Sequence, residues 1–218
     1  MHTVRLKGTS KTLRVGKIVC LARNYSEHIR ELGNAVPEKP VLFIKPASSI
    51  IGHREAVVIP AFSQDCHHEV ELAVLIGKWG KNIGAKDALN HVAGYGVALD
   101  MTLRDVQNEL KQKGLPWEIA KGFDTACPLS DFVPAAEVGD PHNLRITLKV
   151  NEQLRQDGNT AQMMLRIPEI IRAVSEIFTL EEGDVILTGT PSGVGAVQSG
   201  DRMLAEIEKV GCLETPVQ

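Results

Sequence analysis

Long apolar runs are missing from this sequence, in which no stretch approaches the roughly 20 consecutive apolar residues that a membrane-spanning helix requires. The segment from Met1 to Lys7 is not followed by the apolar core of a signal peptide. An excess of one charge is missing as well. The formal net charge is −3, which gives no electrostatic basis for binding nucleic acid or an anionic membrane surface. We therefore expect a protein that is not secreted and binds neither membranes nor nucleic acid.

Cysteines are few and lack the spacing of a metal or redox motif. The four of them, Cys20, Cys66, Cys127 and Cys212, lie far apart and form no C-x-x-C. Cys66 precedes a histidine, but the second, spaced pair that zinc requires is absent. Reduced thiols in a cytoplasmic protein fit this pattern best.

Repeats, low-complexity tracts and an interdomain linker are also absent. The chain has 218 residues, of which 43% are hydrophobic and 23% charged, so it can bury a core of ordinary composition. The glycine-rich segment 188–195 lacks both the Gly-Lys-Ser/Thr of a Walker A loop and the G-x-G-x-x-G of a dinucleotide site. Alone it indicates a tight turn, although its backbone N–H groups can bind a carboxylate or phosphate. We expect a single domain.

The most informative stretch that is present runs from His67 to Gly77. Side chains switch sides at every residue of a strand, so one apolar face is predicted for Val70, Leu72, Val74 and Ile76. Glu69 and Glu71 then share the opposite face, where two ionised carboxylates repel each other unless a cation binds. For such a pair alone, a half-exposed strand with solvated glutamates is the commoner arrangement.

A third acid follows the next apolar strand, predicted for residues 94–99. An acid at the end of a strand commonly lies beside a site, and here it is Asp100. Glu69, Glu71 and Asp100 together offer only oxygen ligands and three negative charges. Such a set suits a hard divalent cation, Mg²⁺ or Mn²⁺.

A short helix is predicted after the strand Lys17–Ala22, and it carries a histidine and a glutamate on one face. Asn24 and Glu27 have the spacing of a capping box at its start. His28 and Glu31 are three residues apart and can touch. The pair is either solvated on an exposed turn, or Glu31 orients and charges His28, which then acts as a general base. We expect a lid near residues 28–38.

A second helix is predicted from Thr102, as its N-cap, to Lys113. Arg104 and Gln107 project from its first two turns next to Asp100. Closeness to the predicted metal site is what distinguishes them from ordinary helix surface. Further elements are expected as strands at 41–44, 56–59 and 183–187, a hairpin that turns at 151–152, and a helix with a core face of Ile167, Ile170, Ile171, Val174 and Ile177.

Lys121 lies in a fairly apolar setting, within Trp117 to Asp124. Burial there would lower the pKa of its ammonium, whereas a bound anion would keep it charged. A solvated lysine is the default alternative.

These motifs occur together in one family, because the chain resembles the fumarylacetoacetate hydrolase family and its short acylpyruvate hydrolase branch, in which some members decarboxylate oxaloacetate. The resemblance runs from about Lys17 to the C-terminus, which leaves residues 1–16 as an N-terminal extension of a catalytic domain spanning 1–218. It rests on Arg23-Asn24-Tyr25 with His28 and Glu31, His68-Glu69-x-Glu71, Leu99-Asp100-x-Thr102-x-Arg104-Asp105-x-Gln107, Trp117-x-x-x-Lys121-x-Phe123-Asp124, Gln156-x-Gly158-x-Thr160 and Thr188-Gly189-Thr190-Pro191-x-Gly193-Val194-Gly195. Any one motif is weak, and six in the family's order are specific.

The resemblance implies an α+β fold, a mixed β-roll or β-sandwich with flanking helices, in a homodimer. It implies Mg²⁺, or Mn²⁺, on Glu69, Glu71 and Asp100. Catalysis is implied for His28, Glu31 and Lys121, and contacts to a small 2-oxo acid for Arg23, Arg104, Gln107, Gly189 and Thr190. Two departures concern the backbone only. Ala22 stands where relatives often have glycine, and Asn151-Glu152 replaces an Asn-Gly turn, in which Glu152 would tolerate a positive φ poorly.

The activity so implied is metal-dependent cleavage of the C–C bond of acylpyruvates such as acetylpyruvate or fumarylpyruvate. The metal and Lys121 would stabilise a pyruvate enolate, and His28 would deprotonate the attacking water. Decarboxylation of oxaloacetate needs the enolate but no water. The alternatives are an isomerase or decarboxylase of unsaturated oxo-dioic acids in aromatic catabolism, an oxaloacetate tautomerase, and a non-catalytic metal or 2-oxo acid binder. A binder would not need the base.

Overall fold

A six-stranded mixed sheet lies at the centre of the fold, with its strands in the order β11-β8-β7-β14-β3-β4. The computed structural model describes residues 2–33 and 35–218. Within that part of the chain, β14 and β3 are the parallel neighbours of this sheet, and its other pairs are antiparallel. The strands are β3 (Lys17–Ala22), β4 (Val41–Pro46), β7 (Val70–Ile76), β8 (Val92–Leu99), β11 (Val133–Pro134) and β14 (Val185–Leu187).

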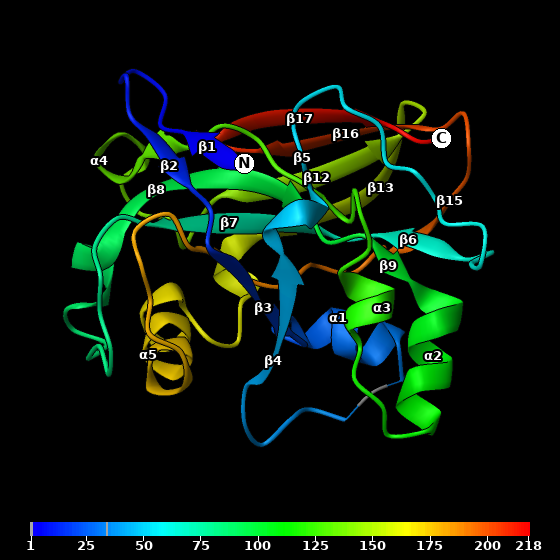
Figure 1. Cartoon of the computed structure of the whole chain (residues 1–218), viewed down its shortest axis with the longest axis horizontal. Helices are drawn as coiled ribbons and strands as arrows, with labels where there is room; N and C mark the ends of the chain where they lie inside the picture. Colours follow the sequence, from blue (N-terminus) through cyan, green and yellow to red (C-terminus); the bar gives the residue numbers. More distant parts are fainter. Residues whose placement is uncertain (1, 34) are drawn as a thin grey trace.

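A four-stranded antiparallel sheet packs on one face of the central sheet and is seen at the top of Figure 1. Its order is β13-β12-β16-β17, from β12 (Arg145–Val150), β13 (Gln153–Asn159), β16 (Arg202–Ile207) and β17 (Gly211–Pro216). Smaller sheets pair β1 (Thr3–Arg5) with β2 (Thr12–Arg14), β5 (Ile50–Ile51) with β10 (Cys127–Pro128), and β6 (Cys66–His68) with both β9 (Thr102–Leu103) and β15 (Gly195–Val197).

The helices flank the sheets. Figure 1 shows α1, α2 and α3 gathered at one end, below β6 and β9, and α5 at the other end. Their bounds are α1 (Ser26–Glu31), α2 (Arg104–Gln112), α3 (Glu118–Lys121), α4 (Ala135–Val138) and α5 (Ile167–Ile177), with 3₁₀ turns at Ala47–Ser49, Ala88–His91 and Thr160–Gln162. The predicted α+β class with flanking helices is confirmed. In the described part of the chain, no helix is long and apolar enough to cross a membrane.

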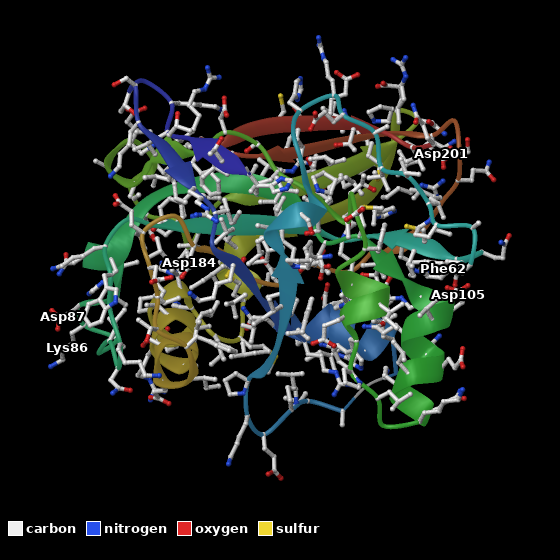
Figure 2. The ribbon with its side chains drawn as sticks, in the orientation of Figure 1. Phe62, Lys86, Asp87, Asp105, Asp184 and Asp201 are labelled. Carbon is white, nitrogen blue, oxygen red and sulfur yellow. The ribbon has the colours of Figure 1, made fainter. Side chains whose placement is uncertain are left out.

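Strand β7 is buried on both faces. The predicted apolar face of Val70, Leu72, Val74 and Ile76 packs in the main core, against the four-stranded sheet and α5. Ala73 and Leu75 pack in a second core on the other face, which the β1–β2 hairpin covers with Val4 and Leu13. The polar face of the strand is therefore not solvated. Charged side chains such as Lys86 and Asp87 project from the rim instead (Figure 2).

Two predicted elements differ in the structure. Residues 56–59 form no strand, because only Val57 pairs, in an isolated bridge with Val217. Ile177 ends α5 with 61% of its surface exposed, so the core face of that helix stops at Val174. The hairpin turn keeps positive φ at both Asn151 and Glu152, at 49° and 64°, as a type I′ turn requires.

Asn24 is not the N-cap of α1, as its spacing from Glu27 predicts. Tyr25 holds the N-cap position without a side-chain hydrogen bond. The buried amide of Asn24 instead donates to the carbonyls of Thr188 and Leu165, at 2.9 and 3.0 Å, and accepts from Leu165 N at 2.7 Å. Tertiary partners have replaced the local one, and Asn24 ties the end of β3 to the loop after β14.

We expect Asn24→Ala to lower the free energy of unfolding by about 3 kcal/mol, because the buried carbonyl of Thr188 and two half-buried backbone groups of Leu165 lose their partner. Urea unfolding followed by circular dichroism measures this change. Asn90→Ala is the matched control, since that side chain is exposed and its loss should change stability by less than about 0.5 kcal/mol. Equal effects of the two variants would contradict the role assigned to Asn24.

Candidate active site

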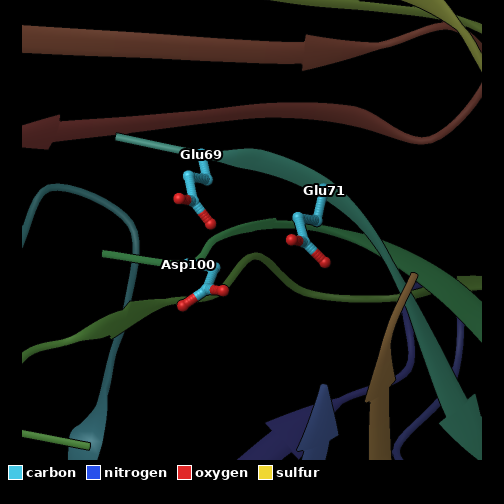
Figure 3. A group of neighbouring side chains, drawn as sticks. All are labelled: Glu69, Glu71 and Asp100. Atoms are coloured by element: carbon cyan, nitrogen blue, oxygen red, sulfur yellow. The ribbon is translucent and has the colours of Figure 1, made fainter. Parts of the chain in front are cut away.

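Three carboxylates converge at the junction of β6 and β7 with the end of β8 (Figure 3). Glu69 lies in the break between β6 and β7, and Glu71 lies one pleat further along β7. Val70 pairs with Leu99, and Asp100 N donates to Glu69 O at 2.8 Å, so the register places Asp100 opposite the glutamates. The three offer oxygen atoms within 4.8 Å of one another, and all three side chains are buried.

Lys121, at the end of α3, contacts two of these acids. Its Nζ donates to Asp100 Oδ2 at 2.7 Å and to Glu69 Oε2 at 2.9 Å. The third proton goes to Thr102 Oγ1 at 2.6 Å. Thr102 is therefore not the N-cap of α2: it lies in β9, and Leu103 holds the cap position. A direct contact to Lys121 has replaced the predicted local cap.

Arg104 and Gln107 turn inward from the first two turns of α2 and are the buried residues of that helix. An Arg104 guanidinium nitrogen, Nη2, donates to Glu69 Oε1, and Nη1 donates to Gln107 Oε1 at 2.6 Å. The apolar side chains of Val106 and Leu110 on the same helix are only half-buried. The polar face of the helix thus points at the acids.

A second buried lysine, missed in the sequence, lies beneath Asp100. Lys45 Nζ donates to the carbonyls of Met101, Ala126 and Lys121 and lies 2.8 Å from Asp100 Oδ1. The sequence feature that could have predicted it is a lysine inside the apolar strand β4, because a buried charge is tolerated only when it is paired.

The charges of the cluster shift the pKa values of its acids in opposite directions. Burial, and then the carboxylates of Asp100 and Glu69, raise the pKa of Glu71 well above its usual value. Burial also acts to raise the pKa of Glu69, but Lys121 and Arg104 outweigh it and lower that pKa. Burial acts to lower the pKa of Lys121, yet the two carboxylates outweigh it and raise that pKa. Lys121 is therefore not a solvated lysine, and carboxylates of the protein keep its buried ammonium charged.

This donor set fits a hard divalent cation. It consists of carboxylate oxygens only, which Mg²⁺ and Mn²⁺ prefer. Asp100 Oδ1 is buried and accepts no hydrogen bond, since the protons of the neighbouring Lys45 are directed at carbonyls. An open lone pair on a buried carboxylate, beside a glutamate whose charge is destabilised, is what a bound cation would satisfy.

The predicted dyad of His28 and Glu31 is formed on α1. His28 Nδ1 lies 3.4 Å from Glu31 Oε2, and the imidazole is buried at the wall of the cavity. The imidazole lies close enough to the Glu69 carboxyl to help lower the pKa of that group. Glu31 Oε1 accepts from Gly193 N at 3.0 Å, which ties α1 to the loop after β14. Part of the predicted lid, residue 34, lies outside the described residues.

The loop after β14 directs one of its N–H groups at an acid of the cluster. Gly189 N donates to Glu71 Oε2 at 2.6 Å. Gly189 has φ of +93°, and a Cβ there would lie 2.8 Å from Asn24 Cβ, so glycine is required on both counts. Gly189 and Thr190 also line the cavity.

Gln156 of β13 joins the acidic strand to this loop. Its Oε1 accepts from Val70 N at 3.1 Å, and its Nε2 donates to Thr190 Oγ1 at 2.8 Å and to Pro191 O at 2.9 Å. Because the backbone N–H fixes the orientation of the amide, His68 Nδ1 must donate to the same Oε1, at 3.1 Å. Burial lowers the pKa of His68 to about 4, so its ring is neutral near pH 7.

We expect Gln156→Leu to lower the free energy of unfolding by about 3 kcal/mol, since four polar groups lose their partner in the interior. Turnover should fall about tenfold or more, because the residues next to Val70 and Thr190 are Glu69 and Gly189. Gln153→Leu, on an exposed position of the same strand, is the control. Denaturant melts and steady-state rates measure both effects. Equal behaviour of the two variants would contradict this role.

The three acids, Lys121 and His28 line one cavity of about 220 Å³. Every residue that the sequence analysis assigned to the site contributes to its wall except Glu31, which stands behind His28. Arg23 belongs to the wall and has a positive φ of 62°, which is rare for a residue other than glycine and common at functional sites. Such a cavity can hold a cation together with a small anion.

Comparison with known proteins agrees with this geometry. Residues 17–218 match the family model described as "Fumarylacetoacetate (FAA) hydrolase C-terminal". The chain is 50% identical over 201 residues to the mitochondrial oxaloacetate tautomerase FAHD1 of Bos taurus, covering 92% of this chain and 91% of that protein. It is 53% identical over 190 residues to the oxaloacetate tautomerase YcgM of Escherichia coli, covering 87% of each.

A crystal structure of fumarylpyruvate hydrolase from Pseudomonas aeruginosa, in complex with Mn²⁺ and pyruvate, has the same fold. Its TM-score is 0.95 at 38% identity, and the match covers 99% of this chain and 94% of that one. A divalent metal in that relative agrees with the acidic cluster of Glu69, Glu71 and Asp100. The chain described here is a member of the fumarylacetoacetate hydrolase family.

Proposed function

We propose that this protein is a divalent-metal-dependent hydrolase that cleaves the C–C bond of acylpyruvates, that is, 2,4-dioxo acids such as acetylpyruvate or fumarylpyruvate. One observation carries the proposal: three converging buried acids share their cavity with a histidine that a glutamate contacts. A metal site alone would serve a binder, whereas His28 with Glu31 supplies a base. The relative named fumarylpyruvate hydrolase supports the same reaction.

Glu69, Glu71 and Asp100 would hold the cation, which we propose to be Mg²⁺, with Mn²⁺ as a substitute. When bound, it would act as a Lewis acid that stabilises negative charge on the oxygens of a 2-oxo acid. Arg104 and Lys121 hold the Glu69 carboxylate in place through Nη2 and Nζ. The Gly189 N–H holds the carboxylate of Glu71 in the same way.

His28 would take a proton from water, and the resulting hydroxide would attack the C4 carbonyl of the dioxo acid. The C3–C4 bond would break, which releases a carboxylic acid and leaves its electron pair on C3 as the enolate of pyruvate. Protonation at C3 completes the reaction. Lys121 stays positively charged beside the developing enolate. Glu31 would stabilise the imidazolium of His28.

Oxaloacetate tautomerisation is the second candidate, and the names of the relatives at 50% and 53% identity favour it. Moving a proton between C3 and the keto oxygen also passes through an enolate and needs a base, but no water. Decarboxylation of oxaloacetate would use the same enolate. Isomerisation of unsaturated oxo-dioic acids remains a further alternative from the sequence.

The test is turnover by metal-stripped protein on acetylpyruvate and on oxaloacetate, with and without added Mg²⁺ or Mn²⁺. We expect added metal to restore cleavage of acetylpyruvate to acetate and pyruvate. Restored conversion of oxaloacetate alone would replace the hydrolase assignment with tautomerase or decarboxylase. Absence of metal-dependent turnover on either would refute both.

We further propose that residues 1–218 form one catalytic domain and that two copies associate as a homodimer. The β1–β2 hairpin of the N-terminal extension supports the first point, because it contributes Val4 and Leu13 to the second core. The family resemblance supports the second. Light scattering after size-exclusion chromatography measures the mass, and a monomer of 23.7 kDa would refute the dimer.

We also keep a cytoplasmic location as a proposal, although relatives at 50% identity are named mitochondrial. The four cysteines are free thiols, of which only Cys212 is exposed, and this supports a reducing compartment. Fractionation of the source cells tests it.

A further inference from the structure

One face of α2 lines the cavity along its length. The residues are Arg104, Gln107, Asn108 and Lys111, spaced three, one and three apart, as one side of an α-helix requires. Arg104 is buried against Glu69, whereas Lys111 is exposed at the other end of this row. A rise of 1.5 Å per residue separates the two positions by about 10 Å along the helix axis. The row therefore runs from the acidic cluster to the exposed end of the cavity at Lys111, which we call its mouth.

Lys111 and Arg23 bring two positive charges to the wall of this cavity. Burial, and then the charges of Arg23 and Arg104, lower the pKa of Lys111, so the three cations act on one another. Arg23 comes from the strained turn after β3, so two separate elements bring positive charge to one place. Like charges gathered at a cavity mouth repel one another, and a bound anion would relieve that repulsion.

Two cations of the wall contact carboxylates of the protein directly. Lys121 contacts Glu69 and Asp100, and Arg104 contacts Glu69. Four cationic side chains of the wall, Arg23, Arg104, Lys111 and Lys121, stand against three acids, a formal balance of +1. A divalent cation raises this balance to +3. A substrate with one carboxylate leaves +2, and one with two carboxylates leaves +1.

We infer that Lys111, together with Arg23, selects acylpyruvates that carry a second carboxylate at the far end of the acyl group. This inference rests on the proposed function. The 2-oxo acid end lies at the acidic cluster, and the distal carboxylate lies at the mouth, between α2 and the turn after β3. Fumarylpyruvate has such a carboxylate, and acetylpyruvate has a methyl group there.

The first experiment compares kcat/KM for fumarylpyruvate and for acetylpyruvate in Lys111→Met, Lys111→Glu and the parent. We expect the ratio of the two constants to fall about fivefold in Lys111→Met, as for the loss of one partly exposed ion pair, and further in Lys111→Glu. Lys113→Met is the matched control, because that lysine pairs with Glu109 on the exposed side of the same helix end. An unchanged ratio in both Lys111 variants would overturn the inference.

The second experiment needs no turnover. Calorimetry with Mn²⁺-loaded protein compares 2-oxoglutarate with 2-oxopentanoate, which have five carbons each and differ in the distal carboxylate. We expect tighter binding of 2-oxoglutarate by the parent and a loss of that preference in Lys111→Glu and Arg23→Gln. Equal loss for both ligands would overturn the inference. Failure of the parent to cleave any acylpyruvate would refute the proposed function but leave this comparison valid.

Discussion

Glu71→Gln is expected to lower metal-dependent turnover about 1000-fold, since one of the three proposed charged ligands is lost from a Lewis-acid site that supplies several kcal/mol. The metal-free protein should be at least as stable as the parent. Glu71 is buried beside two other carboxylates, so a neutral amide removes repulsion, and its oxygen can still accept from Gly189 N. Calorimetric titration with Mn²⁺ and thermal melts of the metal-free protein measure the two effects.

Asp100→Asn provides the contrast. That carboxylate lies against both Lys45 and Lys121, so its neutralisation leaves two buried ammonium groups with less opposing charge. Metal binding should be lost here too, but the free energy of unfolding should fall by about 3 kcal/mol. Asp87→Asn, on the rim, is the control for both variants. Unaltered Mn²⁺ affinity in Glu71→Gln would contradict the assignment of Glu71 as a ligand.

His28→Ala is expected to lower acylpyruvate hydrolysis by about 100- to 10,000-fold, the usual contribution of a general base. Mn²⁺ affinity should change little, because His28 is not one of the three acids. Glu31→Gln should give a smaller loss, since it removes the negative charge beside the imidazole but leaves the ring in place. Initial rates of acetylpyruvate cleavage, together with calorimetry, separate the two effects.

The oxaloacetate reactions add a second readout for the same variants. Decarboxylation needs no activated water, so His28→Ala should spare it relative to hydrolysis. His2→Ala serves as the control, because that histidine is exposed and far along the chain from the cavity wall. Hydrolysis at the parent rate in His28→Ala would exclude it as the base.

Strands β3 and β7 were predicted correctly from local patterns, whereas the strand predicted at 56–59 does not form. Strand β3 has the predicted bounds, Lys17–Ala22. The alternation of side chains along β7 predicted that Glu69 and Glu71 lie on the same face, because residues two apart in a strand point to the same side. Asp100 was predicted from its place at a strand end, and the register of β7 with β8 explains why it meets the glutamates.

The predictions of helix caps failed because those side chains have a choice of partner. Asn24 and Thr102 each have the composition and spacing of a helix cap, but both are directed at groups far away in sequence, Leu165 and Lys121. Local spacing cannot reveal such partners. Lys45 was missed for the same reason, since its acid lies 55 residues further along the chain.

The central claim is that Glu69, Glu71 and Asp100 bind a divalent cation in the same cavity as the 2-oxo acid. A crystal structure of the protein grown with Mn²⁺ and pyruvate tests it most directly, through the anomalous scattering of manganese. We predict one strong peak about 2.1 Å from an oxygen of each of the three carboxylates, the distance that hard divalent cations of this size prefer. A peak elsewhere, or none among these residues, would contradict the assignment.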